Sequence, residues 1–415
     1  MTVSVALPRR HPVAAAVSFA LAAIVALGAP AAHANDESLP LYLTLSQSVT
    51  RDSNLLRDDD DKQADTVSTT AVRVGLNKAY GRQSYSLDVT ASHNKYQTFD
   101  QFNYNGLVSS GEFITDIGSN LRLTANAAAS ETLPKFEDSS DNRRGRNTQT
   151  TKRAALDLRY GLYGRVSVNA GYNRSNLKYR LTEADNRKSD TWSVGARYQP
   201  HDLMNYGLTY SETDSELPDG RVTPEEIHRR NLSLVANWRV TGFSLLTGRL
   251  GYSRERYEVD PARDFNGVTG SAAWAFTPAG KVSYRVNWMR DTNNQGGYSV
   301  AGQLVSQTGS ANRLTNQYSA SATWQATAKI SATAQLTHIR YDEESKTTIS
   351  VPGQEATDSD ERAGRLNAIS LGVDYRPIRS VNVGCDVQRY DRSASVFSRA
   401  YSGQALSCSL GFTLD

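Results

Sequence analysis

The sequence predicts an all-β fold, a transmembrane up-and-down antiparallel β-barrel of about eighteen strands, with sixteen as the alternative. Three observations support this prediction. Apolar and polar residues alternate over strand-length segments along most of the chain, which sorts them onto opposite faces of a strand. The connections between these segments alternate between short turns and long polar loops. A leading apolar segment has the composition of a secretory signal.

The leading segment is expected to be a cleaved signal peptide. A pair of arginines precedes an apolar run from 13 to 31, and the sequence AHA then offers a small-x-small cleavage site. A membrane anchor is the alternative, because the apolar run approaches the length that spans a bilayer. We therefore expect 1–34 to be removed and 35–415 to form a single outer-membrane barrel domain.

The overall composition fits a β-protein and excludes a helical membrane protein. Of the 415 residues, 39% are hydrophobic and 21% are charged, and no segment after the first apolar run is continuously apolar. Tyr and Gly are abundant, at 21 and 29 residues, and both are common in strands and turns. Lys+Arg 46 nearly balances Asp+Glu 43, so net charge indicates no partner, and nothing suggests nucleic acid.

Strands are expected wherever the period-two alternation is clear. In chain order, the expected strands are 41–50, 70–78, 85–93, 102–115, 121–129, 154–160, 166–172, 192–198, 206–210, 231–240, 246–252, 268–276, 282–288, 318–326, 330–338, 369–375, 381–388 and 406–414. The alternation is weakest at 41–50 and 102–115.

The connections predict how the barrel is oriented. Short turns include YGRQ at 80–83 and TPAGK at 277–281, whereas long loops begin at Arg51, Thr132 and Asp291. Outer-membrane barrels have short periplasmic turns, long extracellular loops and even strand numbers. An even number places both termini in the periplasm, where the last strand can close against the first and leave no unpaired edge.

The alternation also assigns the two faces of the wall. Val166 and Val168 would face lipid, while Ser167 and Asn169 would face the interior, which is the reverse of a soluble barrel. A soluble solenoid or sandwich with one wet face is the alternative. With about eighteen strands the interior is wide enough to hold water, so the sequence predicts an aqueous lumen.

Charged residues on the predicted inner face are the candidate functional residues. Seven are cations and four are anions: Arg73, Arg122, Arg159, Arg197, Arg239, Arg249 and Arg285, with Asp88, Asp157, Asp374 and Asp386. An excess of guanidinium groups favours anionic solutes, and two oppositely charged walls would set up a transverse field. A generic polar lumen with internal ion pairs is the alternative, and a register error of one residue would reverse an assignment.

The two cysteines are expected to form a cross-strand disulfide. If the final hairpin folds about its loop, Cys385 lies opposite Cys408, with both side chains on the lipid-facing side. The oxidising periplasm favours this bond, which would pin the closing hairpin. Two reduced thiols packed as small hydrophobic groups are the alternative.

Catalysis and cofactor binding have little support. After the leading segment the chain retains His93, His201, His228 and His338, with no metal-ligand spacing and no nucleophile motif. The acidic run DDDDK lacks the glycine and spaced ligands of a calcium loop, and a solvated extracellular loop explains it. We expect no enzyme activity, no cofactor and no metal.

Three segments resemble a known family. The stretch SQSVTRDSNLLRDDDD resembles the opening of certain outer-membrane barrels, with matches in type at Asp52, Asn54, Leu55 and Arg57. Leu56 stands where that family has an aromatic residue, and Ser53 intervenes. LDVTASHNKYQTFDQFNYNG and CSLGFTL resemble the next hairpin and the last strand of the EpsL-type exopolysaccharide-biosynthesis proteins, within a β-barrel porin superfamily. The resemblance implies a passive conduit for a secreted polysaccharide made by an inner-membrane machine.

The sequence therefore predicts an outer-membrane channel that exports an acidic exopolysaccharide through a polar, arginine-biased lumen. Its expected partners are outer-membrane lipid, the polysaccharide, and the inner-membrane and periplasmic machinery for polysaccharide synthesis and export. Two other functions stay open. One is a general or anion-selective porin for the uptake of small solutes, and the other is a surface receptor or adhesin that acts through its long loops.

Overall fold

The computed structural model describes residues 40–136, 145–217, 224–259, 261–292, 298–301, 306–351, 354–395 and 399–414. The predicted signal peptide lies outside the described residues. The strands are β1 (Leu41–Asp52), β2 (Asp65–Tyr80), β3 (Gln83–Tyr96), β4 (Tyr104–Ile117), β5 (Leu121–Thr132), β6 (Gln149–Tyr160), β7 (Val166–Tyr179), β8 (Arg187–His201), β9 (Met204–Leu217), β10 (Glu225–Thr241), β11 (Ser244–Tyr257), β12 (Phe265–Phe276), β13 (Val282–Thr292), β14 (Tyr298–Ala301), β15 (Ser306–Gln325), β16 (Ile330–Val351), β17 (Gln354–Ile378), β18 (Val381–Arg392) and β19 (Tyr401–Leu414).

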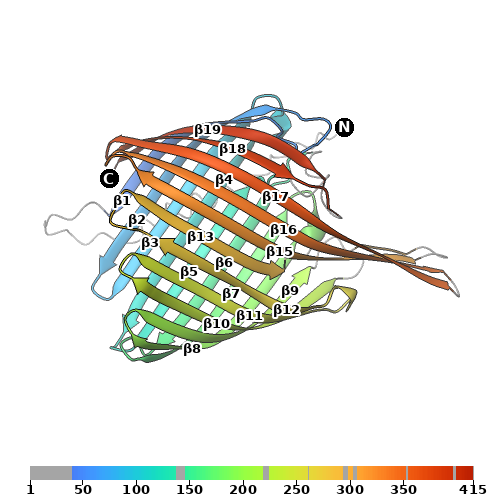
Figure 1. The fold of residues 1–415 in the computed structure, drawn as a ribbon, viewed down its shortest axis with the longest axis horizontal. Helices are drawn as coiled ribbons and strands as arrows, with labels where there is room; N and C mark the ends of the chain where they lie inside the picture. The colour runs from blue at the N-terminus through green and yellow to red at the C-terminus, as the bar shows by residue number, and fades with distance from the viewer. Residues whose placement is uncertain are drawn as a thin grey trace, which may run out of the picture. The chain divides into compact units, whose positions relative to one another are not determined.

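These strands form one closed antiparallel sheet (Figure 1). Apart from β14, each strand pairs with the next strand of the wall along the chain, and β1 pairs with β19 from Leu43↔Leu414 to Asp52↔Ala405. The short β14 pairs with β15 alone, whereas β13 pairs directly with β15. The wall therefore has eighteen strands, and the predicted barrel is confirmed.

The two ends of the barrel differ as the sequence predicts. Tight turns such as Gly81–Arg82 lie at the end where β1 begins and β19 finishes. Three of these turns contain glycine at positive φ, at Gly81, Gly118 and Gly161, a conformation that other residues rarely adopt. The longer connections lie at the opposite end, which is the extracellular end of an outer-membrane barrel.

The pairing fixes which residues share a face. In β10, Leu232 pairs with Tyr210 and Tyr252, and Leu232 is 50% exposed, whereas the intervening Ser233 is 5% exposed. The polar face is the inner one, because Arg229 of β10 reaches Asp291 of β13 at 2.6 Å across two intervening strands. Only the concave side of a curved sheet brings side chains of such distant strands together.

Three extracellular loops share one design. The connections β3–β4, β7–β8 and β11–β12 each contain a 3₁₀ turn: η1 (Asp100–Phe102), η3 (Glu183–Asp185) and η4 (Pro261–Arg263). In each, the backbone N–H of the tyrosine that ends the strand donates to a side-chain oxygen seven residues later. The donor–acceptor distance is 2.7 Å for Tyr96–Asn103, 2.7 Å for Tyr179–Asn186 and 2.9 Å for Tyr257–Asp264. This bond satisfies a backbone donor where the ladder stops.

The structure corrects the predicted loop that follows β13. Strand β14 lies within it, and β15 already begins at Ser306. Similarly, β16 and β17 continue as one long hairpin to Val351 and Gln354 (Figure 1). The sequence does not predict these extensions, because a hairpin beyond the bilayer needs no lipid-facing apolar residues and therefore lacks the alternation.

Candidate functional site

All eleven charged residues predicted for the lumen lie on the inner face. Residues that lie opposite each other in a ladder share a face of the sheet. Following these partners from strand to strand places all eleven on one face; the partners include Arg73↔Thr44, Asp88↔Gly75 and Asp386↔Gly372. The arginines other than Arg73 lie on strands between β5 and β13. Asp374 and Asp386 lie on β17 and β18, and Asp88 lies on β3. Among these eleven residues, six arginines thus gather on one side of the wall together with Asp157, and Asp374, Asp386 and Asp88 lie on other strands.

Two of the arginines are neutralised locally. Arg73 Nε lies 2.5 Å from Asp88 Oδ1, and the Tyr42 hydroxyl donates to the same oxygen at 2.8 Å. Arg122 binds Asp116 through two parallel bonds of 2.7 and 2.9 Å. Bidentate pairs of this kind are strong and directional, so these arginines offer little net charge to the lumen.

The neighbouring arginines lack such partners. Arg159 lies directly opposite Arg122 in the β5–β6 ladder, and its Nε donates to Ser167 Oγ at 3.2 Å. Both Arg122 and Arg197 repel the Arg159 guanidinium electrostatically. A group of like charges without matching carboxylates attracts anions from solution.

The arginine-rich side of the wall continues through the next strands. Within the described part of the chain, no carboxylate forms an ion pair with any of five arginines: Arg159, Arg197, Arg239, Arg249 and Arg285. Asp374 and Asp386 are likewise without a cationic partner among these residues. Because β18 lies half-way round the ring from β8, Asp386 lies across the lumen from Arg197.

Loops narrow the extracellular mouth on one side. Phe102 of η1 is fully buried, and its ring lies 4.7 Å from that of Phe136 and 5.9 Å from that of Tyr96. Leu55 and Leu56 of the β1–β2 loop pack against this cluster. Since Tyr96 is an inner-face residue, these loops lie against the inside of the wall rather than standing away from it.

A charged network covers another part of the mouth. Arg263 of η4 is 2% exposed and contacts both carboxylate oxygens of Glu225, at 2.9 and 3.0 Å. Arg229 joins Glu255 at 3.2 Å and Asp291 at 2.6 Å. These residues could not be recognised from the sequence, because they come from separate strands and lie beyond the clear alternation.

The residues that carry the family resemblance have a structural role here. Arg57 pairs with Asp52 at 2.9 Å, and its guanidinium lies 4.1 Å from the centre of the Tyr390 ring. The Tyr390 hydroxyl donates to Asp52 at 2.5 Å, and Asn54 is fully buried. The motif therefore fastens the first loop to β18 beside the seam where β1 and β19 close the barrel.

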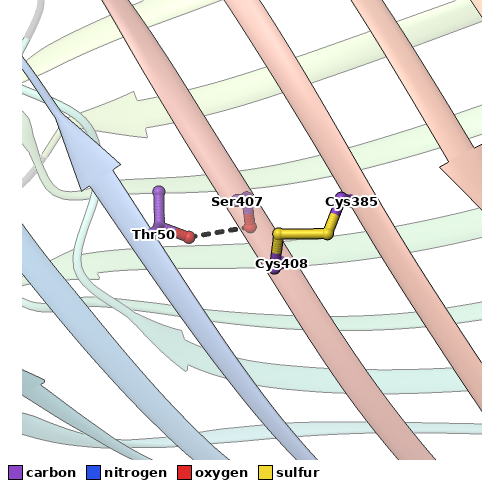
Figure 2. The surroundings of a disulfide bond; sticks show 4 residues. All are labelled: Thr50, Cys385, Ser407 and Cys408. Carbon is purple, nitrogen blue, oxygen red and sulfur yellow. Dashed lines mark hydrogen bonds between the residues drawn. A yellow bond between two sulfur atoms is a disulfide. The ribbon is translucent and has the colours of Figure 1, made fainter.

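The two cysteines form a disulfide on the outer face, between β18 and β19 and next to this seam. Cys385 of β18 lies opposite Cys408 of β19, and the structure joins their sulfur atoms (Figure 2). Next to it, Thr50 and Ser407 share a hydrogen bond of 2.9 Å that links β1 to β19 on the inner face (Figure 2). Val383 pairs with Leu410 in the same register.

One outer-face group has the spacing of metal ligands. Donor atoms of Glu226, His228 and Glu258 lie within 4.8 Å of one another, and Asp214 contacts the other imidazole nitrogen at 2.7 Å. Spacing along the sequence did not reveal this group, because Glu258 comes from the segment after β11. Exposed carboxylates around a histidine are also a common ion-pair arrangement.

The fold defines the class of protein. Among the described residues, no helix has both the length and the apolar character needed to cross a bilayer. Closed barrels satisfy every backbone group within the sheet, and this one presents apolar side chains outward and polar ones inward. The chain is an outer-membrane β-barrel protein of bacteria.

Comparisons place the chain among solved barrels without assigning a family. No model of a known protein family matches it. No curated protein matches it either.

Solved structures similar to this one include three from Pseudomonas aeruginosa. The outer membrane protein OpdK is 13% identical, with 90% of this chain and 98% of that chain covered and a TM-score of 0.47. OccK2 (OpdF) is 14% identical, with 90% and 97% covered and a TM-score of 0.47. The siderophore receptor PirA is 9% identical, with 92% and 82% covered and a TM-score of 0.43. Each likeness is one of fold alone.

Proposed function

We propose that this protein is a passive, water-filled diffusion channel of the outer membrane that favours small anionic solutes. The observation that carries this proposal is the set of five inner-wall arginines with which no carboxylate of the described residues forms an ion pair. Barrels of sixteen to eighteen strands leave an aqueous channel, and cationic lining residues lower the electrostatic barrier to anions. No energy-coupled or catalytic step is part of the proposed function.

Ion selectivity in a planar lipid bilayer tests this proposal. The reversal potential across a KCl gradient should show a permeability ratio that favours chloride. Replacing Arg197, Arg239 and Arg285 by glutamine should move that ratio toward one or below. Arg254→Gln is the matched control, because it removes a cation from the outer face of β11 and should leave the ratio unchanged. A barrel that conducts cations better than anions, or that does not conduct, would contradict the proposal.

Export of an acidic exopolysaccharide is the second candidate, and the sequence resemblance favours it. The same arginine wall would guide a polyanion through hydrogen bonds and charge contacts. However, Asp52, Asn54 and Arg57 already hold the first loop against the wall, so their match to the family indicates shared barrel construction and does not identify the cargo.

Two measurements separate the candidates. A channel for a polymer should lose ionic current when an oligouronate is added, and deletion of the gene should abolish secreted polysaccharide while small-solute uptake continues. A diffusion channel should show the opposite pattern in the deletion strain. A receptor or adhesin that acts through its loops should lose function on loop deletion with conductance intact.

A further inference from the structure

We propose that the outer face of β6, β7 and β8 is a binding site for a phosphorylated lipid of the outer leaflet. The site consists of a basic patch at the extracellular edge and an apolar groove below it. This inference concerns the opposite side of the wall from the lumen, and therefore does not depend on what the channel conducts.

The basic patch is defined by residues whose register is fixed in the sheet. Lys152 of β6, Asn176 of β7 and Lys188 of β8 form one row across three adjacent strands. Two residues along β7 on either side of that row lie Arg174 and Lys178. By the alternation of faces, all five side chains project outward, away from the lumen.

The patch carries an excess of positive charge. The four cations are Lys152, Arg174, Lys178 and Lys188. Asp190 is the acidic member on these strands; it lies 3.9 Å from Arg174 and accepts a hydrogen bond from the Tyr172 hydroxyl at 2.5 Å. On the neighbouring strand β9, Glu216 and Asp214 border the patch, opposite Lys188 and Asp190. In the part of the chain that the structure describes, Lys152, Lys178 and Lys188 form no ion pair.

The outward cations of β10 and β11 are in a different environment. Arg230 pairs with Glu212 at 2.9 Å, and its neighbours on this face include the carboxylates of Asp214, Glu226 and Glu258. Glu226 and Glu258 would repel a phosphate group, whereas the four cations of the patch on β6–β8 would attract one. Charge complementarity thus favours the β6–β8 sector over the β10–β11 sector.

The groove lies directly below the patch. Ala170 stands between Leu158 and Val194 in one row, and Ala196 stands between Val168 and Leu208 in the next. The small side chains leave a depression of about 580 Å³ in the outer surface, lined almost entirely by apolar residues. An acyl chain fits such a depression, and burying its methylene groups there is favourable.

An aromatic pair joins the groove to the patch. The Tyr172 and Trp192 rings lie 4.4 Å apart, and Trp192 is 62% exposed. Tyr and Trp favour the level where lipid headgroups meet acyl chains, which places the cations above them at phosphate height. Basic patches at this level bind lipid headgroups, and Arg and Lys are the residues that contact phosphate.

The occupant is the phosphorylated glycolipid of the outer leaflet, lipid A. The patch lies at the extracellular end of the barrel, which faces that leaflet. Several cations on neighbouring strands match a headgroup with more than one phosphate better than they match a lipid with a single negative charge. The multiple acyl chains of this lipid would extend along the groove toward the middle of the bilayer.

Native mass spectrometry of the detergent-purified barrel with added lipid A tests the site. Lys152→Gln with Lys188→Gln should weaken binding roughly 30-fold, since each cation near the headgroups contributes about fivefold. The control is Lys78→Gln with Lys95→Gln, which removes one outward lysine near the periplasmic turn of β2 and one near the extracellular end of β3, and should leave binding within about twofold of wild type. Heat-dependent migration on gels checks that every variant is folded.

Two further measurements test which lipid binds and whether the groove takes part in binding. Dephosphorylated lipid A and phosphatidylglycerol should each bind far more weakly than lipid A. Ala170→Leu, which fills the groove, should weaken lipid A binding while leaving the patch intact. Equal binding of the dephosphorylated lipid or of phosphatidylglycerol, equal losses in both lysine variants, or no loss in the patch variant would each overturn the proposal.

Discussion

The disulfide between Cys385 and Cys408 should make a measurable contribution to the stability of the closed barrel. The two residues are 23 positions apart, and cross-linking a loop of this length removes chain entropy from the unfolded state worth about 3 kcal/mol. Both side chains are on the outer face, so replacing them by alanine leaves no cavity in a packed core. We expect C385A/C408A to lower the free energy of unfolding by about 3 kcal/mol, with conductance unchanged.

Urea-induced unfolding in lipid vesicles, followed by tryptophan fluorescence and gel migration, measures this difference. Reduction of the wild-type protein should have the same effect as the double substitution, and a reductant should leave C385A/C408A unaffected. If oxidised and reduced wild type unfold at the same urea concentration, then the cross-link does not stabilise the β18–β19 hairpin. The hydrogen bonds of the β18–β19 ladder would then be sufficient to hold it.

The other predictions concern the mouth and two carboxylates of the lumen. Glu225→Gln leaves the Arg263 guanidinium buried beside a neutral partner. The substitution should lower the local stability of this part of the mouth by about 3–5 kcal/mol and expose η4 to added protease. Unchanged cleavage would contradict the assigned role of the pair. Tyr390→Phe removes the hydroxyl that donates a buried hydrogen bond to Asp52, and should lower the free energy of unfolding by about 1–3 kcal/mol in the same urea assay. Asp374→Asn with Asp386→Asn should raise anion selectivity in bilayers, and a shift toward cations would show that these carboxylates do not face the permeating ions.

Much of the fold followed from local rules of the chain. A period of two assigns every residue of a strand to one face, and the turns fix the register of each hairpin. The eighteen strands, the end that carries the long loops and the Cys385↔Cys408 pairing follow from these rules, and the structure shows each of them. The long β16–β17 hairpin did not follow, since polar residues on both of its faces carry no such signal.

The sequence also predicted which charged residues face the lumen, but it did not predict which residues they contact. Alternation placed Arg73, Arg159 and Asp386 inward without saying which of them are neutralised. Arg73 pairs with Asp88 on the adjacent strand, whereas Arg159 has another arginine opposite. That difference depends on the offset between strands, which determines which inward residues lie side by side.

The sequence by itself determined the strands, their faces and the excess of arginine inside, because each depends on residues two apart or on one tight turn. Only the tertiary structure decided the contact of Arg229 with Asp291, the fastening of Asp52 to Tyr390 and the inward packing of the loops. These contacts join strands that are far apart along the chain. They exist because the sheet curves and closes, and curvature and closure are properties of the whole set of strands.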